Sequence, residues 1–285
     1  MSSPHILIVD GQNFLHRARS GFQLGDFAVV FNFMRNFRAQ VELHKPTRVY
    51  FVLEGHPKKR VELFPEYKAN RKVDFDSTDP EVMKKVVEMK NFFRQADIIV
   101  DTLSRYFPVS VIRHSDFECD DVIYNLIKRA TTAVDFTVIS NDSDFTQLLN
   151  EFDNVKVYNP MLKEYVVKTD YDYVSWKSLR GDGSDNIPGI PGIGDKTADL
   201  IINDADALAT LFEDTDKAAL FLKNYELIKF HTWSDEDAMQ MTCSTSEKNW
   251  LCVAELFNEW GFKSILKENT WAKFCDTFNP LFGDT

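Results

Sequence analysis

Four short apolar runs, separated by helical segments, set the fold class of this chain. The runs are HILIVD (residues 5–10), RVYFVLEG (48–55), FPVSVI (107–112) and FTVIS (136–140). Each is typical of a buried strand. Between the first two, FAVVFNFMRNFRAQVELH (27–44) carries apolar residues three and four apart, as on one face of a helix. Strands that alternate with helices predict an α/β fold with a mostly parallel, twisted sheet flanked by helices.

The pattern changes near residue 175. Before it, VKVYN (155–159) and YVVK (165–168) predict two more short strands joined by a turn. From Trp176 onward we expect no strand, and helical stretches with polar breaks run to about residue 278. The sequence therefore predicts an α/β core at residues 1–175 and a helical region at residues 176–285.

Net charge argues at first against nucleic acid as a partner. The chain carries a formal charge of −11 at pH 7, whereas phosphate binding needs Lys and Arg. The objection weakens if the carboxylates gather around metal ions. No apolar run approaches the ~18 residues of a membrane span, and the N-terminus lacks the pattern of a secretory signal. The four cysteines show no C-x-x-C spacing, so we expect free thiols in a cytoplasmic protein.

Acidic residues follow each of the four main runs. In a parallel sheet the loops after the strands meet along one edge, so their carboxylates should converge there. The set is Asp10, Glu54, Glu118, Asp120, Asp121, Asp142 and Asp144. Asp182 and Asp185 are three residues apart, so a helical turn would present both on one face.

A single aspartate of this kind can also be a helix cap or a turn residue. Repetition at four strand ends favours a shared site, because clustered carboxylates repel one another unless cations neutralise them. Oxygen ligands indicate Mg²⁺ or Mn²⁺, and so many ligands suit two ions. Two such ions are suited to in-line displacement at phosphorus.

The stretch GDGSDNIPGIPGIGDKTADLII (181–202) adds a turn to the last two aspartates. IPGIPGIG predicts a tight turn between helices, with Asp195 as the N-cap of the second helix. Gly189, Gly192 and Gly194 would let the backbone approach a ligand closely, and a helix N-terminus attracts phosphate. Lys196 adds a cation beside it. A purely structural turn between helices is the alternative.

Five motifs, in order, resemble those of the 5′-nuclease family. That family includes the bacteriophage 5′-3′ exonucleases and flap endonucleases and the 5′-nuclease domain of bacterial DNA polymerase I. The motifs are VDGQNFLHRA (9–18), FPEYKANR (64–71), FECDDVI (117–123), SNDSDFTQLL (140–149) and GDGSDNIPGIPGIGDKTA (181–198). The resemblance extends to LFNEWGFKSIL (256–266). It implies a structure-specific, Mg²⁺-dependent nuclease that acts on 5′ ends and flaps of branched DNA.

The resemblance also implies a site, residue by residue. The family's metal-site carboxylates fall at Asp10, Glu118, Asp120, Asp121, Asp142, Asp144, Asp182 and Asp185. Two Mg²⁺ ions are implied, with Mn²⁺ as a substitute, and the helix-turn-helix at residues 187–197 is implied to bind the duplex backbone and a K⁺ ion. After the second strand the family usually has Asp, but this chain reads FVLEGH. Glu54 is the nearest carboxylate, and whether it is a direct ligand stays open.

Residues 56–106 are implied to form a helical arch over the site. Asp79 and Pro80 predict a helix start within it, and its Lys, Arg and aromatic residues suit a single strand of DNA. Lys68 and Arg71 match the family's YK..R pattern and are candidates to clamp the scissile phosphate, with Arg17 as a further catalytic candidate. The predicted DNA contacts are Tyr67, Lys72, Lys84, Lys85, Gly189, Gly192, Gly194, Lys196 and Thr197. A solvated charged helix is the alternative for residues 84–94.

We therefore expect a 5′-3′ exonuclease/flap endonuclease that works by two-metal-ion catalysis in DNA replication, repair or RNA-primer removal. Its expected partners are branched or 5′-flap DNA, with an RNA–DNA hybrid and a replisome protein as further candidates. A monomer in the cytoplasm is expected, in a bacterial host if the chain is phage-encoded. The alternatives are a metal-dependent endoribonuclease with a similar core and a non-catalytic protein that binds branched DNA.

Overall fold

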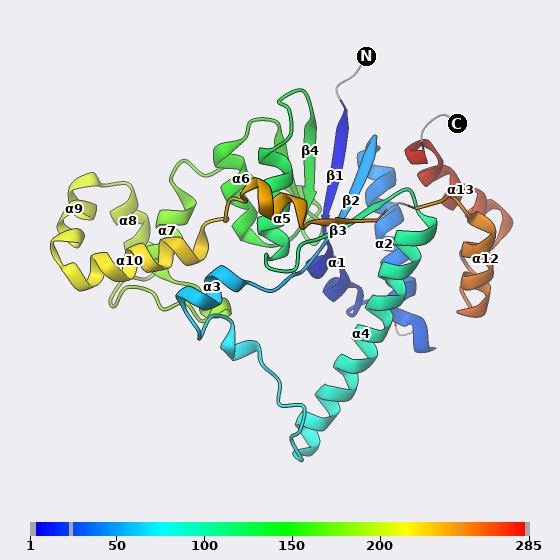
Figure 1. Cartoon of the computed structure of the whole chain (residues 1–285), viewed down its shortest axis with the longest axis horizontal. Helices are drawn as coiled ribbons and strands as arrows, with labels where there is room; N and C mark the ends of the chain where they lie inside the picture. Colours follow the sequence, from blue (N-terminus) through cyan, green and yellow to red (C-terminus); the bar gives the residue numbers. More distant parts are fainter. Residues whose placement is uncertain (1–3, 23–24, 245, 283–285) are drawn as a thin grey trace.

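A seven-stranded sheet forms the centre of the molecule (Figure 1). The computed structural model describes residues 4–22, 25–244 and 246–282. The strand order is β6-β5-β4-β1-β2-β3-β7. The strands are β1 (His5–Asp10), β2 (Arg48–Leu53), β3 (Ser110–Arg113), β4 (Asp135–Ile139), β5 (Val155–Asn159), β6 (Glu164–Tyr165) and β7 (Thr242–Cys243). The five inner strands are parallel, and β6 and β7 are antiparallel edge strands. The predicted α/β class is confirmed.

Helices cover both faces of the sheet, because successive residues of a strand point to opposite sides. Leu7 and Val9 of β1 pack into one core with α1 (Gly11–Ala18), α2 (Ala28–His44) and the second half of α4 (Pro80–Tyr106). Ile6 and Ile8 pack into a second core on the other face with α5 (Cys119–Lys128) and α6 (Thr146–Glu151). The near-continuous apolar strands thus follow from burial on both faces.

The arch segment, defined as residues 56–106, leaves the core and returns to it. It consists of α3 (Lys58–Leu63), the 3₁₀ turn η2 (Ala69–Arg71) and the long helix α4. The Asp79 carboxylate accepts hydrogen bonds from the backbone N–H groups of Glu81 and Val82, and Pro80 is the first helical residue, as predicted. The first half of α4 projects well beyond the sheet (Figure 1). The arch segment therefore stands over the carboxyl ends of β1 and β2.

A helical region lies beside the α/β core. It comprises α7 (Tyr173–Arg180), the 3₁₀ turn η4 (Gly183–Asp185), α8 (Asp195–Ile202), α9 (Ala205–Glu213) and α10 (Thr215–Ile228). These elements have a small core of their own around Leu179, Ile190 and Phe221. Figure 1 shows them as a separate lobe.

The expectation of no strand after Trp176 was wrong. After α11 (Asp235–Met239), β7 pairs with β3, and α12 (Trp250–Glu259) and α13 (Glu268–Phe278) follow. Phe257, Phe274 and Phe278 are fully buried in the core on the α2 face of the sheet. A two-residue edge strand carries no periodicity, so the sequence gives no signal for it. The described residues from 176 to 282 thus comprise the helical lobe and a C-terminal segment that packs on the core.

The structure also bears on membrane-spanning helices and on the state of the cysteines. No described helix has both the length and the apolar character needed to span a bilayer. Cys119, Cys243, Cys252 and Cys275 are free thiols.

A candidate metal centre at the carboxyl edge of the sheet

The carboxylates at the strand ends line a single cavity of about 430 Å³. Its acidic lining consists of Asp10, Glu54, Glu118, Asp120 and Asp142. Each is placed by the end of a strand or the start of a helix, because parallel strands deliver their following loops to the same edge. The structure therefore brings together five of the nine predicted ligands directly.

Asp10 and Asp142 are oriented by the backbone as well as by side chains. Asp10 is the N-cap of α1, where Oδ1 accepts from the N–H of Asn13 at 3.0 Å and Oδ2 from the hydroxyl of Ser140 at 2.7 Å. Asp142 Oδ1 accepts from the N–H of Asp144 at 2.9 Å. Cap and ligand roles are thus compatible, since each carboxylate has a second oxygen or lone pair to offer.

Burial raises the pKa of four of these carboxyl groups. Burial raises the pKa values of Asp10 and Asp142 and raises the pKa of Asp120 well above its usual range. Burial, followed by repulsion from Glu118, raises the pKa of Glu54 to about 7. Carboxylates that are costly to ionise in the absence of a cation are the groups that a divalent cation stabilises most. The oxygen donor set fits Mg²⁺ or Mn²⁺.

Glu118 is surrounded by donors. One of its oxygens, Oε1, accepts from the ammonium of Lys68, and the other accepts from the phenol of Tyr67 at 3.0 Å and the guanidinium of Arg60 at 2.7 Å. One oxygen from each of Glu118, Asp120 and Asp121 lies within 4.8 Å of the others. Glu118 is therefore the point where the acidic and basic parts of the site meet.

Asp121 lies at the predicted metal site, where Arg60 pairs with its carboxylate. Its carboxylate receives Arg60 Nη1 on Oδ2 at 2.5 Å and Nη2 on Oδ1 at 3.1 Å, and Oδ1 also accepts from the N–H of His231 at 2.7 Å. Both oxygens are thus engaged, although Asp121 lies beside the other two acids. The sequence spacing could not reveal this, because Arg60 belongs to a basic run that looks like a surface.

Asp144 and Asp182 share a buried lysine instead of lining the cavity. The ammonium of Lys177, which is 4% exposed, pairs with Asp144 and with Asp182 Oδ2 at 2.7 Å. Burial by itself would raise the pKa of Asp182, but Lys177 and Ser184 outweigh it and lower that pKa to about 2. Burial raises the pKa of Asp144 despite Lys177. Lys177 was not identified from the sequence, where it is one cation in an amphipathic helix.

Lys68 and Arg71 lie at the site, with Asp185. Lys68 Nζ is 3.8 Å from Asp185 Oδ2, and Arg71 pairs with Asp185 Oδ1. The backbone joins the two segments as well, since the N–H of Lys68 donates to the carbonyl of Asp185 at 2.9 Å. Although burial would lower the pKa of Lys68, Glu118 and Asp185 raise it. Lys68 is therefore charged, and both Lys68 and Arg71 lie next to the metal-site carboxylates.

Arg17 also lines the cavity, and Tyr67 does not. Arg17 Nη1 is buried without a hydrogen-bond partner among the described residues. Tyr67 is 6% exposed, and its phenol donates toward Glu118 and Asp185, both at 3.0 Å. The prediction that Tyr67 is a DNA contact therefore does not fit, because its ring is packed in the core formed with Val174 and Leu227.

The glycine turn presents some of its predicted groups and buries others. Gly192 (φ +83°) and Gly194 have open space around them, and Lys196 and Thr197 are exposed. Gly189 is different, because a Cβ there would lie 2.0 Å from the carbonyl oxygen of Arg180. Gly189 is therefore needed for packing, because a side chain would not fit at this position.

The N-cap of α8 is also not the predicted residue. Gly194 occupies the cap, and Asp195 is the first helical residue, with its carboxylate paired with Arg180. The three lysines among the predicted contacts of the arch segment, Lys72, Lys84 and Lys85, are all exposed.

Family models match most of the chain. Residues 5–177 match the 5′-3′ exonuclease N-terminal resolvase-like domain, and residues 169–232 match the 5′-3′ exonuclease C-terminal SAM fold. The 5′-3′ exonuclease of Bacillus subtilis is 29% identical over 236 residues, which is 75% of this chain and 75% of that protein. DNA polymerase I of the same organism is 30% identical over 233 residues, 75% of this chain and 25% of the polymerase. The chain thus spans about a quarter of that polymerase.

Solved structures share the fold. T5 5′-exonuclease with divalent metal ions (zinc) bound has a TM-score of 0.63 and 23% identity, covering 79% of this chain and 89% of that one. The bacteriophage T5 flap endonuclease in a pseudo-enzyme-product complex with DNA and metal ions has a TM-score of 0.63 and 21% identity, covering 79% and 88%. The catalytic core of Rad2 with DNA substrate has a TM-score of 0.53 and 14% identity, covering 98% and 92%.

Proposed function

The chain belongs to the 5′-3′ exonuclease family, and on that premise we propose that it is a structure-specific 5′-nuclease acting on 5′-flap and branched DNA. One observation supports the proposal. Five carboxylates, of which Asp10 and Glu118 are buried, converge with two cations of the arch segment on one cavity at the carboxyl edge of the sheet. A binder of DNA gains nothing from such a cluster, whereas phosphodiester hydrolysis needs metal ligands and phosphate-binding cations together.

In this proposal the carboxylates of the cavity bind metal ions and its cations bind the phosphate. Asp10, Glu118, Asp120 and Asp142 hold divalent cations, with Glu54 beside them. When bound, such cations lower the pKa of an attacking water and stabilise charge on the phosphate oxygens.

Lys68 and Arg71 change partners in this proposal, from carboxylates to the scissile phosphate. Their charge-assisted hydrogen bonds then stabilise the developing negative charge. Arg17 lines the same cavity, and its Nη1 has no hydrogen-bond partner among the residues that the structure describes; it is the third phosphate-binding group. The products are a 5′-phosphate and a 3′-hydroxyl.

The finer features are proposals of the same kind. Two Mg²⁺ ions, replaceable by Mn²⁺, are supported by the number of oxygen ligands. The exposed turn around Gly192, Gly194 and Lys196 is the proposed contact with the duplex backbone and a K⁺ ion, since helix N-termini and open backbone suit phosphate.

The biological setting is a proposal that the relatives support, two of which are a bacterial 5′-3′ exonuclease and a DNA polymerase I. We place the chain in DNA replication or repair in the cytoplasm of a bacterium, encoded by the cell or by a bacteriophage. It acts as a monomer, with RNA–DNA hybrids as a second substrate class and a replisome protein as a further partner.

The test is metal-dependent cleavage of a labelled 5′-flap by the wild-type chain and by Asp120→Ala and Asp142→Ala. We expect cleavage to be nearly abolished in both variants, while DNA binding measured in Ca²⁺ changes little. Both substitutions remove a metal ligand and neither removes a phosphate contact. Cleavage of single-stranded RNA but not of flaps would favour the endoribonuclease alternative. Binding of branched DNA without any cleavage would favour the non-catalytic one.

A further inference from the structure

Arg60 is a buried cation at the base of the arch segment, where α3 meets the helical lobe. Its side chain is 2% exposed. All five of its N–H donors are used, because Nη1 donates to Glu118 and Asp121, Nη2 to Asp121 and the carbonyl of Lys229, and Nε to the carbonyl of Leu227. A fully satisfied guanidinium in a protein interior is held in one orientation. Arg60 therefore makes a rigid connection among the elements that it touches.

These contacts join the metal centre to the end of α10. The carbonyls of Leu227 and Lys229, 2.8 and 3.1 Å from Arg60, lie at the C-terminal end of that helix, which favours a cation. On its other side Arg60 is 2.7 Å from Glu118 Oε2. One side chain thus spans from a metal-site carboxylate to a helix of the lobe.

Helix α10 in turn holds the glycine turn. Asn224, fully buried in α10, donates from Nδ2 to the carbonyl of Pro188 at 2.7 Å and to that of Ser178 in α7 at 3.0 Å. Ile190 of the turn packs against Phe221 of α10 in the core of the lobe. Glu118 is therefore connected to the turn through Arg60, α10 and Asn224, and each step is a hydrogen bond or a helix.

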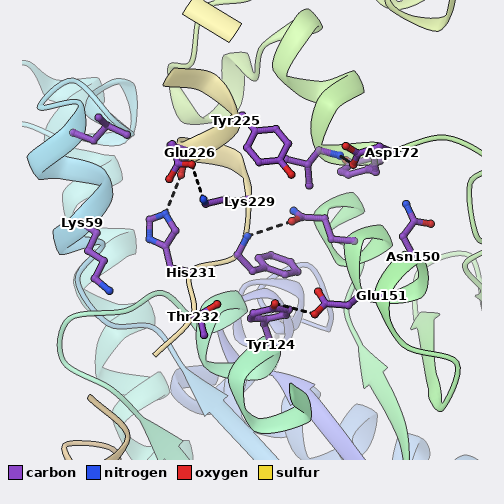
Figure 2. A pocket seen from close by; sticks show the side chains of 15 residues that line it. Lys59, Tyr124, Asn150, Glu151, Asp172, Tyr225, Glu226, Lys229, His231 and Thr232 are labelled. Atoms are coloured by element: carbon purple, nitrogen blue, oxygen red, sulfur yellow. Dashed lines mark hydrogen bonds and ion pairs between the residues drawn. The ribbon is translucent and has the colours of Figure 1, made fainter. Parts of the chain in front are cut away.

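The strap, defined as residues 228–233, reinforces this connection where the chain leaves α10. Gln147 of α6 donates to the carbonyl of Ile228 at 3.2 Å and accepts from the N–H of Phe230 at 3.3 Å. Asn125 of α5 bonds His231 and Trp233 in the same way. Figure 2 shows His231 of the strap beside Lys59 and Lys229 of the strap beside Glu226, where they line a cavity of about 760 Å³. The strap is thus held beside this cavity by side-chain hydrogen bonds from Gln147 and Asn125.

We propose that Arg60 is a positioning residue that sets the cleavage register, meaning which phosphate of the bound strand is cut. This inference rests on the proposed function. The turn grips the duplex backbone, the metal centre cuts it, and Arg60 fixes the distance between them. Successive phosphates of one strand advance by about 3.4 Å along the duplex. A shift of a few ångströms between lobe and metal centre therefore brings a neighbouring phosphate into place.

The experiment maps products of a 5′-flap cut in a single turnover at saturating Mg²⁺ and DNA. Arg60→Lys keeps the charge but has three donors for five acceptors. Gln147→Met replaces a side chain of similar size and removes the two hydrogen bonds that hold the strap to α6. Gln147 makes these bonds to backbone groups and not to a carboxylate. Arg129→Lys is the matched control, because Arg129 is a surface arginine paired with Asp235. Circular dichroism checks that each variant is folded.

We expect one dominant product from the wild type and from Arg129→Lys. Arg60→Lys and Gln147→Met should give products at neighbouring phosphates, with DNA affinity within about twofold of wild type. The rate of Arg60→Lys should fall roughly 10- to 100-fold, the cost of a misplacement of about 1 Å.

A slow Arg60→Lys variant that still yields the single wild-type product would overturn the inference and leave the proposed function intact. If Arg60→Lys does not fold, Gln147→Met decides, and an unchanged product from that variant overturns the inference. No cleavage by the wild type would overturn the proposed function, and the inference with it.

Discussion

At the scale of single residues, Glu54 is the carboxylate whose role depends most on bound metal. Its Oε2 accepts a long hydrogen bond of 3.2 Å from the N–H of Cys119. Its pKa of about 7, raised by burial and then by Glu118, leaves it partly protonated at neutral pH. A divalent cation must displace this proton, so metal affinity should rise with pH through about 7.

We therefore expect Glu54→Gln to lower metal affinity and to flatten its pH dependence, because an amide cannot ionise. Glu54→Asp should be mild. Added Mg²⁺ should restore part of the rate of Glu54→Gln, and Mn²⁺ should rescue it better than it rescues Asp142→Ala. The measurement is a metal titration of the single-turnover rate at pH 6 and pH 8. An unchanged metal dependence in Glu54→Gln would place Glu54 outside the ligand set.

The sequence allowed us to predict which acidic residues gather at the site, but not which cations are buried beside them. Strand ends indicated where carboxylates gather, because topology alone brings them to one edge. Arg60 and Lys177 carry no comparable signal, since a buried arginine and an exposed one look alike in a basic run. Their burial depends on which acids the fold places opposite them, and that is a property of tertiary structure.

At the scale of elements, the arch segment and the glycine turn should contribute to different steps. Lys68→Ala and Arg71→Ala should slow single-turnover cleavage by roughly 10- to 1000-fold, if each stabilises charge that develops on the phosphate. Rates are compared at saturating DNA and metal. Normal rates at saturation would show that these side chains do not act on the scissile phosphate.

Lys196→Ala should weaken duplex binding and leave the cleavage step intact. Lys196 is exposed at the first turn of α8, apart from the cavity. The slope of log affinity against log salt should decrease in magnitude by about one unit, the contribution of one phosphate contact. Fluorescence anisotropy of a labelled duplex in Ca²⁺ measures it, and Lys163→Ala in the β5–β6 loop is the control. Equal slopes for wild type and Lys196→Ala would exclude the contact.

Element boundaries were predicted well where periodicity is strong and poorly where it is absent. The sequence placed β1 and β5 at their observed residues, and the start of α4 at Asp79 and Pro80. It did not reveal β7, which pairs through only two residues with β3. Nor did it show that Tyr67 packs inward, because its neighbours Lys68 and Arg71 suggested a DNA-facing surface.

At the scale of the whole molecule, the acidic cavity should make stability depend on pH and on metal. The pKa values of Asp10, Glu54, Asp120, Asp142 and Asp144 are raised. The metal-free fold therefore holds protons that the unfolded chain releases above pH ~4, and stability should fall as pH rises from about 5 to 8. Asp182, with a pKa of about 2, does not titrate in this window.

Added Ca²⁺ should offset this loss, so the gain in Tm over EDTA should be larger at pH 8 than at pH 5.5. A gain of about 1 kcal/mol corresponds to roughly 2–4 °C for a chain of this size. Thermal melts in both conditions measure it, with Asp142→Ala as the control that should show a smaller gain. Equal gains at the two pH values would show that the buried carboxylates do not ionise on metal binding.

The packing of α13 on the core bears on how the protein is made. Phe274 and Phe278 contact Phe107 with ring centroids 6.1 and 5.1 Å apart, so part of the core on the α2 face of the sheet stays uncovered until these late residues arrive. On a translating ribosome the helical lobe would be synthesised before the nuclease core is closed. Newly made chains would then complete this core only after α13 has left the exit tunnel, so a chain that still lacks α13 would not yet cut nearby DNA.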